Sequence, residues 1–311
     1  MIARYNVQGT TRVAMGVNVT GDDKSGAHAA FRAIDAADAV VLALGTDTLA
    51  VEHEGHDRES VTLPLDSAQV WFALNILQRA NATNTPVTLV LVNGGSVSVD
   101  DLDRMGPIHA MVEAFFPGPR GAEAVARHLL GVDNRWGRLP YSIMTSNFGE
   151  AYALADYRMS FRTYRYAQPM FISFPFGFGL SYTQFSLSRP IATEQGAAVQ
   201  LSVKNVGGRQ GDVVLMAYFR PLQLESKHAF TAASALHRQL FAFRRLALER
   251  GAMADVTIPV SAADLALFDD GGVRRTVDGV FSLVFSTGAA ESGDVALTVK
   301  IVNGQLAPAQ Q

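Results

Sequence analysis

The sequence contains no cysteine. That absence excludes disulfides, cysteine-ligated zinc, iron–sulfur clusters and thiol nucleophiles. The sequence also has no apolar run near the about 20 residues that a bilayer-spanning helix needs, and residues 1–23 contain no continuous apolar stretch typical of a signal peptide. We therefore expect neither a membrane span nor a signal peptide in these residues. The sequence leaves the compartment open, secretion of a parent protein included.

An excess of charge of one sign is also missing. The 26 Lys and Arg residues stand against 29 Asp and Glu, which gives a formal net charge of -3. Such a balance offers no electrostatic reason to bind nucleic-acid phosphates or an anionic membrane, and we expect neither as a partner. With 48% hydrophobic residues over 311 positions, the chain can bury a full core, and its length suits about two domains.

The first half of the sequence alternates helical patterns with short apolar runs. The apolar runs, which show no period of two, are Ala39–Gly45, Val87–Val92 and Ile108–Phe116. The helical patterns contain Phe31 and Ile34, then Val70, Leu74 and Leu77, and then Ala122–Leu130. Strands that are apolar on both faces and are separated by helices indicate a parallel sheet covered on both sides. We predict an α/β domain over residues 1–145.

Capping residues predict where these helices begin and end. Ser25 is a candidate N-cap for the first helix, and Asp66 with Gln69 has the spacing of a capping box for the second. Gly131 follows the third helical pattern and is predicted to be its C′ residue.

The second half has no helical period. Residues 146–182 are rich in aromatic residues, proline and glycine and are predicted to be an extended connector. Short strands separated by glycine-containing turns then indicate an antiparallel sandwich over residues 183–303. The predicted strands are Val199–Asn205, Val213–Phe219, Gln239–Leu246, Asp255–Pro259, Val280–Ser286 and Asp294–Val302. Residues 222–238 are predicted to be a surface insertion, and residues 304–311 a frayed tail.

The densest polar cluster, Glu52–Glu59, follows the carboxyl end of a predicted parallel strand. Ligands of open α/β sheets bind at that edge, and a carboxylate there is a candidate general acid. A solvated charged loop is the alternative interpretation of the same residues. A zinc site is not expected, because His53 and His56 are three residues apart, whereas the helical zinc motif places its histidines at i and i+4.

Three other patterns predict no chemistry. Asn93-Gly94-Gly95-Ser96 closes a predicted strand but lacks the Gly-Lys-Ser/Thr ending of a phosphate loop, so it is interpreted as a tight turn. The sequence has no Gly-x-Ser-x-Gly elbow, so serine hydrolysis is unsupported. The aromatic run Phe171–Phe178 is interpreted as packing rather than as a sugar platform.

Taken together, the motifs resemble a known family. Three motifs resemble the C-terminal α/β domain of glycoside hydrolase family 3. They are Gly45-Thr46-Asp47, Glu52-x-Glu54-Gly55-x-Asp57-Arg58 and Leu63-Pro64. Further matches, in the family's order, are Gly137-Arg138-Leu139-Pro140, Arg162-Thr163-Tyr164-Arg165-Tyr166 and Phe174-Pro175-Phe176-Gly177-Phe178-Gly179-Leu180-Ser181-Tyr182-Thr183. Val203–Gly207 and Leu265–Asp270 resemble the family's fibronectin type III-like module. The motifs are most similar to the β-xylosidase and β-glucosidase branch.

The resemblance implies a retaining mechanism with two carboxylates. By motif position the acid/base is Glu54, with Glu52 as the second candidate, and Asp57 and Arg58 would hold its loop. In the family the Asp nucleophile belongs to an N-terminal (β/α)8 barrel, for which about 250 residues are needed. The nucleophile is therefore expected to be absent from this chain, and the sheet is expected to be incomplete at its N-terminus.

The implied function is exo-hydrolysis of terminal β-linked xylose or glucose, without a metal or an organic cofactor. The implied partners are a carbohydrate and a barrel-bearing domain or subunit. By itself the chain is expected to show little or no hydrolysis. One alternative is a non-catalytic remnant that binds carbohydrate or a subunit, and another treats the sandwich as a stability module.

Two departures from the family pattern concern the loop that contains Glu54. The chain has one extra residue between Asp47 and Glu52, and it has Pro64–Gln69 in place of a Pro-Gly turn.

Overall fold

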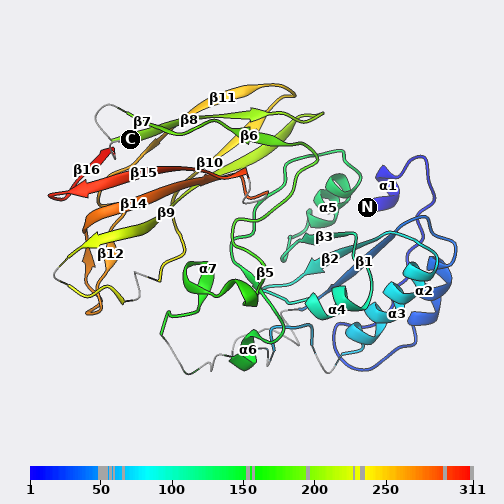
Figure 1. Cartoon of the computed structure of the whole chain (residues 1–311). Coiled ribbons are helices and arrows are strands. Elements are labelled where there is room, and N and C mark those ends of the chain that lie inside the picture. The colour runs from blue at the N-terminus through cyan, green and yellow to red at the C-terminus, as the bar shows by residue number, and fades with distance from the viewer. Residues whose placement is uncertain are drawn as a thin grey trace. The chain divides into compact units, whose positions relative to one another are not determined.

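The computed structural model describes residues 1–47, 55, 58, 60–64, 67–151, 155, 158–193, 197–226, 228–231, 235–289 and 293–308 (Figure 1). The chain divides into two compact units. The α/β unit comprises Met1–Asp133, Ile143–Tyr157 and Met170–Phe174. The β unit comprises Asn134–Ser142, Arg158–Pro169 and Pro175–Gln311. None of the helices in the described part of the chain has the length and apolarity that crossing a bilayer requires.

A three-stranded parallel sheet is the centre of the α/β unit. Its strands are β1 (Val40–Gly45), β2 (Val87–Val92) and β3 (Ala110–Glu113), in the order β1-β2-β3 (Figure 1). The helices of the unit are α1 (Ile2–Tyr5), α2 (Ala27–Ile34), α3 (Gln69–Ala82), α4 (Asp100–Met105), α5 (Gly121–Leu129) and α6 (Phe148–Ala151). A small antiparallel pair joins β4 (Ile143–Met144) to β5 (Ile172–Phe174), which follows the short helix η1 (Pro169–Phe171). The predicted α/β class with a parallel sheet is confirmed.

The core of this unit lies between the sheet and helices α2, α3 and α4. Leu42 and Leu44 of β1 point into it, as do Leu89 and Leu91 of β2. The helices contribute Phe31, Ile34, Phe72, Ile76, Leu77 and Leu102. Both Leu89 and Leu91 are completely buried, as the unbroken apolar pattern of this strand predicts for a central parallel strand.

The ends of the elements differ in part from the predicted ones. Ser25 is not the N-cap of α2: Gly26 occupies that position, and the Ser25 hydroxyl donates to Asp23 instead. Gly131 is the C′ residue of α5, as predicted, with φ 68° and its N–H donating to the His128 carbonyl. The strand predicted over Ile108–Phe116 is shorter, because Phe115 has φ 55°, in the left-handed region that no strand residue occupies.

Gln69 is the first residue of α3 and does not act as the capping-box residue the spacing suggested. Its side chain is buried, and its Oε1 accepts from the Gly45 N–H at 2.9 Å. Its Nε2 donates to the Gly45 carbonyl at 2.9 Å and to the Val19 carbonyl at 2.8 Å. One amide therefore pairs both backbone groups at the end of β1. Asp66 lies outside the described residues.

The β unit contains two antiparallel sheets that share one core. One sheet has the order β10-β9-β14-β15-β16, and the other β11-β8-β6 with β7 beside β8 (Figure 1). The strands are β6 (Phe185–Leu187), β7 (Ile191–Ala192), β8 (Ala198–Asn205), β9 (Gly211–Glu225), β10 (Gln239–Leu248), β11 (Met253–Pro259), β14 (Asp278–Ser286), β15 (Val295–Val302) and β16 (Gln305–Pro308). A further hairpin pairs β12 (Leu267–Phe268) with β13 (Arg274–Arg275). Leu201 and Ile258 from one sheet meet Leu215, Phe219 and Phe281 from the other.

Two predictions for this half are wrong. Residues 222–238 are not simply a surface insertion, because β9 extends to Glu225 and because Phe230 and Leu236 are buried in the shared core. Gln305–Pro308 does not fray: it pairs with β15 as the edge strand β16. Phe230 and Leu236 pack against residues far away in the sequence, which a local pattern does not reveal. Strand β16 instead pairs with the strand directly before it in the chain.

Most of the predicted connector belongs to the β unit. The Tyr164 ring, in helix α7 (Thr163–Tyr166), stacks on Phe176 with 4.1 Å between ring centroids. Both rings contact the edge or face of Tyr218 on β9, whose phenol is buried. The Tyr164 hydroxyl also accepts from the N–H of Leu240, the second residue of β10. The aromatic residues of the connector therefore anchor it to the larger sheet.

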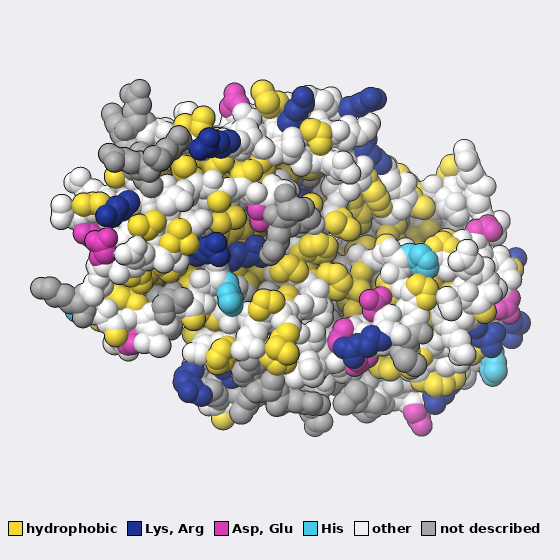
Figure 2. Space-filling model, viewed as in Figure 1, with side chains coloured by type: hydrophobic (Ala, Val, Ile, Leu, Met, Phe, Trp, Pro, Cys, Tyr) yellow, Lys and Arg dark blue, Asp and Glu magenta, His cyan; other side chains and the backbone are white. Residues whose placement is uncertain are grey.

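On the face drawn in Figure 2, the acidic and basic side chains of the described residues are scattered among polar and apolar ones and form no extended field of one charge. This distribution agrees with the formal net charge of -3.

We predict that Gln69→Ala lowers the free energy of unfolding of the α/β unit by about 3 kcal/mol, because it leaves the buried N–H and carbonyl of Gly45 and the half-buried carbonyl of Val19 without this partner. The measurement is urea unfolding followed by Trp71 fluorescence in a Trp136→Phe background. The control is Gln78→Ala, which removes an exposed glutamine from the same helix and should change the free energy by less than about 0.5 kcal/mol. Equal effects of the two substitutions would contradict the prediction.

Candidate functional site

The loops that follow β1, β2 and β3 begin at the same edge of the parallel sheet. Such carboxyl edges are where open α/β sheets bind ligands. The polar motif of residues 52–58 lies in the loop after β1. Of its predicted site residues, Arg58 is described, whereas Glu52, Glu54 and Asp57 lie outside the described residues. The roles assigned to those three carboxylates therefore stay predictions.

The end of β1 approaches β2 unusually closely. A Cβ atom on Gly45 would overlap the carbonyl oxygen of Val92, so glycine is required at this position. The next residue, Thr46, is buried, and its N–H donates to the same carbonyl at 3.0 Å. Within the motif, Gly55 has φ 82°, a conformation that side-chain-bearing residues rarely adopt. Gly45 and Gly55, the two glycines within residues 45–58, thus have a steric and a conformational reason respectively.

Arg58 connects the loop after β1 to the loop after β2. Its Nη2 donates to the Ser96 carbonyl at 2.8 Å, and its Nη1 lies 3.4 Å from the Thr62 carbonyl. The resemblance implied that this arginine helps to hold its loop, and the Ser96 and Thr62 carbonyls are among its acceptors. Because a guanidinium is always charged and presents several donors in a fixed plane, it can hold two carbonyls at once.

The segment after Arg58 runs beside residues 96–98. Thr62 and Ser98 form a parallel β-bridge, and the Ser98 N–H donates to the Val61 carbonyl at 2.6 Å. Leu63 follows and is only 2% exposed. The C-terminal side of the motif is therefore fixed to the loop after β2 by backbone pairing and by an apolar anchor.

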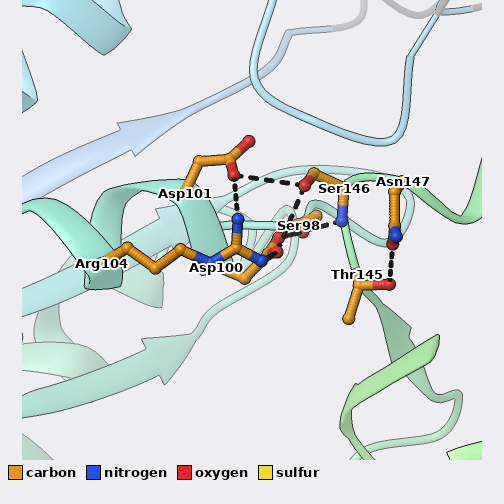
Figure 3. A network of polar contacts seen from close by, with 7 residues as sticks. All are labelled: Ser98, Asp100, Asp101, Arg104, Thr145, Ser146 and Asn147. Atoms are coloured by element: carbon orange, nitrogen blue, oxygen red, sulfur yellow. Dashed lines mark hydrogen bonds and ion pairs between the residues drawn. The ribbon is translucent and has the colours of Figure 1, made fainter. Parts of the chain in front are cut away.

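Figure 3 shows a polar network that continues from Ser98. The Ser98 hydroxyl donates to Asp100 Oδ1, and the Ser146 N–H donates to the same oxygen at 2.9 Å. Asp100 Oδ2 accepts from the Ser146 hydroxyl at 3.2 Å and from Arg104 Nη2 at 2.7 Å. Arg104 also pairs with Asp101 at 3.0 Å. The network joins the beginning of α4 to the segment that follows β4.

The Asp100 carboxylate is stabilised by these donors. Its side chain is 14% exposed. Burial raises the pKa of Asp100, but the hydrogen bonds from Ser98 and from Ser146, together with the charge of Arg104, outweigh burial and hold the pKa below its ordinary value. The network is thus built for the ionised acid, and its function is to hold backbone segments together.

Two further polar groups are buried at the same edge, the side chain of Asn93 and the carboxylate oxygens of the half-buried Glu113. Asn93 follows β2 and is completely buried; its Nδ2 donates to the Gly95 carbonyl, which closes the turn. Glu113 is the last residue of β3. Burial raises the pKa of Glu113 to about 7, against the Phe115 N–H and the Asn93 amide, which favour the charged form. Sequence reasoning missed the contributions of Asn93, Glu113 and Asp100.

Some of these residues carried a signal in the sequence. Glu113 is the one acid in the apolar run Ile108–Phe116. Charged residues are rarely buried in such a strand unless they have a hydrogen-bond or ion-pair partner. Asn93 was interpreted as part of a tight turn, which it is, but its burial depends on how β2 and β3 pair. Asp100 had no distinguishing pattern, because its main partner, Ser146, is 46 residues away.

No metal centre is found among the described residues, since no three His, Cys, Asp or Glu side chains come together there. His53 and His56, whose spacing argued against zinc, lie outside that part of the chain.

The chain thus combines a parallel α/β unit, which has a polar motif after its first strand, with an antiparallel β unit. The chain belongs to glycosyl hydrolase family 3: the profile described as "Glycosyl hydrolase family 3 C-terminal domain" matches residues 3–182, more than half of the chain. The predicted family is therefore confirmed.

Known proteins agree with this assignment. A beta-glucosidase of Rhizobium radiobacter is 29% identical over 289 residues, which cover 85% of this chain and 34% of that protein. A beta-xylosidase of Formosa agariphila is 28% identical over 302 residues, covering 92% of this chain and 39% of that protein. The chain thus spans about a third of the length of the curated relatives it matches.

The fold agrees with solved structures as well. The structure of a family 3 exo-beta-xylosidase, XlnD, in complex with a xylobiose aziridine activity-based probe superposes with a TM-score of 0.78. The match covers 96% of this chain and 40% of that one at 23% sequence identity, so it bears on the fold alone.

We predict that Asp100→Asn lowers the free energy of unfolding at pH 7 by about 2 kcal/mol, because an amide cannot accept from all the donors that surround the carboxylate. Since folding holds the pKa of Asp100 down, its contribution is complete above the unfolded-state pKa of about 4 and is lost as pH falls through the folded-state pKa. The difference from the parent should therefore narrow in acid.

Asp103→Asn is the matched control, since Asp103 is an exposed aspartate on the same helix α4. It should change stability by less than about 0.5 kcal/mol. Urea unfolding at several pH values, followed by Trp71 fluorescence in the Trp136→Phe background, measures both. A difference between Asp100→Asn and the parent that stays constant down to pH 3 would contradict the assignment of an ionised Asp100.

Proposed function

We propose that this chain is the C-terminal portion of a retaining exo-β-glycosidase that removes terminal β-linked xylose or glucose, with Glu54 as its acid/base residue. The family assignment supports a glycosidase, and the two relatives compared above are named for glucosides and xylosides. The observation that carries the proposal is the anchoring of Arg58: the motif's arginine is bonded to the Ser96 and Thr62 carbonyls at the carboxyl edge of the sheet.

The chemistry requires two carboxyl groups about 5–5.5 Å apart. One attacks the anomeric carbon, and the other protonates the departing glycosidic oxygen. In the second stage the residue that gave its proton takes one from water. The water attacks the anomeric carbon and releases the sugar from the nucleophilic carboxylate. We assign the proton transfers to Glu54 and the attack to an Asp nucleophile on a barrel-bearing domain or subunit outside these 311 residues.

Arg58 and Asp57 support the acid/base residue in this proposal. The distance between the two carboxyl groups must be maintained closely, because a small misplacement of a catalytic group lowers the rate strongly. Arg58 supplies one fixed end for the loop through its two carbonyl acceptors, and Leu63 supplies a buried anchor just beyond it. Glu54 is preferred to Glu52 because of its position in the motif, directly before Gly55.

The β unit is proposed to be a fibronectin type III-like module that supports the rest of the chain. Two antiparallel sheets around one core are consistent with such a sandwich. The stacking of Tyr164 on Phe176, next to the buried Tyr218, gives the module a means to hold the connector. This role needs no contact between the module and the sugar.

We predict that Glu54→Gln in the full-length gene product lowers kcat/KM for β-xylobiose or cellobiose by about 10²–10⁴-fold, the usual contribution of general acid–base catalysis. An aryl glycoside whose phenol leaves without a proton should keep much of its rate of glycosyl-enzyme formation. Azide, which needs no base, should speed turnover of the variant and yield a β-glycosyl azide.

Glu52→Gln is the control, with the same chemical change two residues away. It should show a smaller loss and no rescue by azide. If the rescue belongs to Glu52→Gln instead, Glu52 is the acid/base and the assignment to Glu54 is wrong. Normal hydrolysis by both variants, or binding of sugar without hydrolysis by the parent protein, would favour the non-catalytic binding remnant.

The 311-residue chain alone is expected to show little or no hydrolysis of 4-nitrophenyl β-xyloside or β-glucoside. Turnover by the purified chain that Glu54→Gln abolishes would contradict the placement of the nucleophile outside it.

A further inference from the structure

Three buried acceptor atoms at the carboxyl edge of the parallel sheet have no hydrogen-bond partner in the described part of the chain. They are Asn93 Oδ1 and both carboxylate oxygens of Glu113. The Phe115 N–H and the Asn93 amide lie near enough to the carboxylate to favour its charged form, but neither donates with hydrogen-bond geometry. A buried acceptor without a donor costs about 1–3 kcal/mol, more for a charged one. The missing element of this cluster is a hydrogen atom.

Strand pairing explains why the two side chains are neighbours. Glu113 pairs with Leu91 in the parallel register of β2 and β3. Asn93 is two residues beyond Leu91 in the chain, immediately after the end of β2. The last residue of β3 is therefore brought beside the first loop residue after β2.

Asn93 shapes the turn to which Arg58 is attached. Its Nδ2 donates to the Gly95 carbonyl, and the following carbonyl, that of Ser96, accepts from Arg58 Nη2 at 2.8 Å. Two residues later, the Ser98 N–H pairs with the Val61 carbonyl. The orientation of the Asn93 amide thus decides where the acceptor for Arg58 lies. A chain of direct contacts leads from Glu113 through Asn93 and the 93–96 turn to the arginine of the motif.

A protonated Glu113 supplies the hydrogen that the cluster lacks. A neutral carboxyl carries one O–H donor and keeps acceptor capacity, whereas the ionised group only accepts. On the helices that flank β3 in the chain, the charged side chains are either paired or exposed. Arg104 pairs with Asp100 and Asp101, and Asp103 is exposed. Glu123 pairs with Arg120, and Arg127 pairs with Asp133. Asp47 after β1 and Arg58 are the other charged described groups of this edge, and neither is among the groups that shift the Glu113 pKa.

We propose that Asn93 and Glu113 are positioning residues: Glu113, as a neutral acid, exchanges a hydrogen bond with the Asn93 amide, which holds the 93–96 turn and, through Ser96, the guanidinium of Arg58. The proposal rests on the proposed function only for its consequence, the placement of the loop that carries Glu54. Its structural part concerns described residues of the α/β unit and is testable without catalysis. Ionisation of Glu113 would leave the amide without its donor and loosen the turn.

The test is NMR of the 311-residue chain with ¹³C-labelled glutamate carboxyls and ¹⁵N,¹³C-labelled arginine. Loss of one resonance in Glu113→Gln identifies Glu113, and Arg58→Lys identifies Arg58. We expect the Glu113 carboxyl to titrate with a midpoint of about 7. The Arg58 guanidinium resonances should shift with the same midpoint, while those of Arg127, which is bonded to Asp133, serve as the reference in the same spectrum. A midpoint near the ordinary glutamate value of about 4.3 would overturn the proposal.

Two variants separate positioning from stability. Glu113→Gln keeps a donor and an acceptor at every pH, so the Arg58 resonances should stay in their low-pH positions and lose their titration near 7. Asn93→Asp removes the Nδ2 donor to the Gly95 carbonyl and should displace the Arg58 resonances at every pH. Asp38→Asn, an exposed carboxyl in the same unit, is the matched control and should change neither.

Three results would overturn the proposal. If Arg58 still titrates near 7 in Glu113→Gln, another group moves it, and if Asn93→Asp leaves Arg58 unchanged, the turn does not carry the contact. A general loss of stability without a specific shift of Arg58 would also overturn the proposal. Because these measurements use no substrate, a failed activity test of Glu54 would leave them unaffected, and the two failures are distinguishable.

Discussion

Backbone groups at the end of a parallel sheet need partners that the strands themselves do not provide, and side chains supply them in the α/β unit. The Gln69 amide pairs with the N–H and the carbonyl of Gly45, and Asn93 closes the turn after β2. Arg58 binds the Ser96 and Thr62 carbonyls. Buried backbone groups without partners are rare because each costs free energy. The satisfaction of these groups therefore helps to determine the shape of the loops at the carboxyl edge of the sheet, where we propose the site to lie.

These side chains link structure to the proposed chemistry through rigidity. Catalytic groups must be held in place by residues whose own positions are locked. The guanidinium of Arg58 is held by two carbonyls, the Ser98 region is held by Asp100, and Asp100 is held by Ser146 and Arg104. Figure 3 shows how closely the last of these groups converge. Glu113 differs from the rest, because its burial disfavours the charge that the Asp100 network favours. Two acids near one sheet edge thus have opposite preferences, each set by its donors.

The β unit illustrates a separate use of side chains. Its core is formed by alternating residues of two antiparallel sheets, and the aromatic residues of the connector are attached to the larger of them. A segment that has no regular period, such as residues 222–238, still contributes Phe230 and Leu236 to that core. Aromatic and leucine side chains bury enough apolar area to fix an irregular segment without strand pairing.

The sequence by itself determined the α/β class, the position of most strands, the family and the motif that contains the candidate acid, because these depend on local patterns and on fixed spacings. Val87–Val92 was identifiable as a strand of a parallel sheet from its unbroken apolar pattern, whereas its central place in the sheet came from the strand pairing. Tertiary structure decided what Gln69 and Asp100 do, since each bonds a group from another part of the chain. It also brought Asn93 and Glu113 to the same edge of the sheet. It made Gln69 a partner of Gly45 rather than a capping residue, and it placed Arg58 on Ser96, which is 38 residues away. The physical reason is that burial and hydrogen-bond partners arise from long-range packing, which a short window of sequence does not contain.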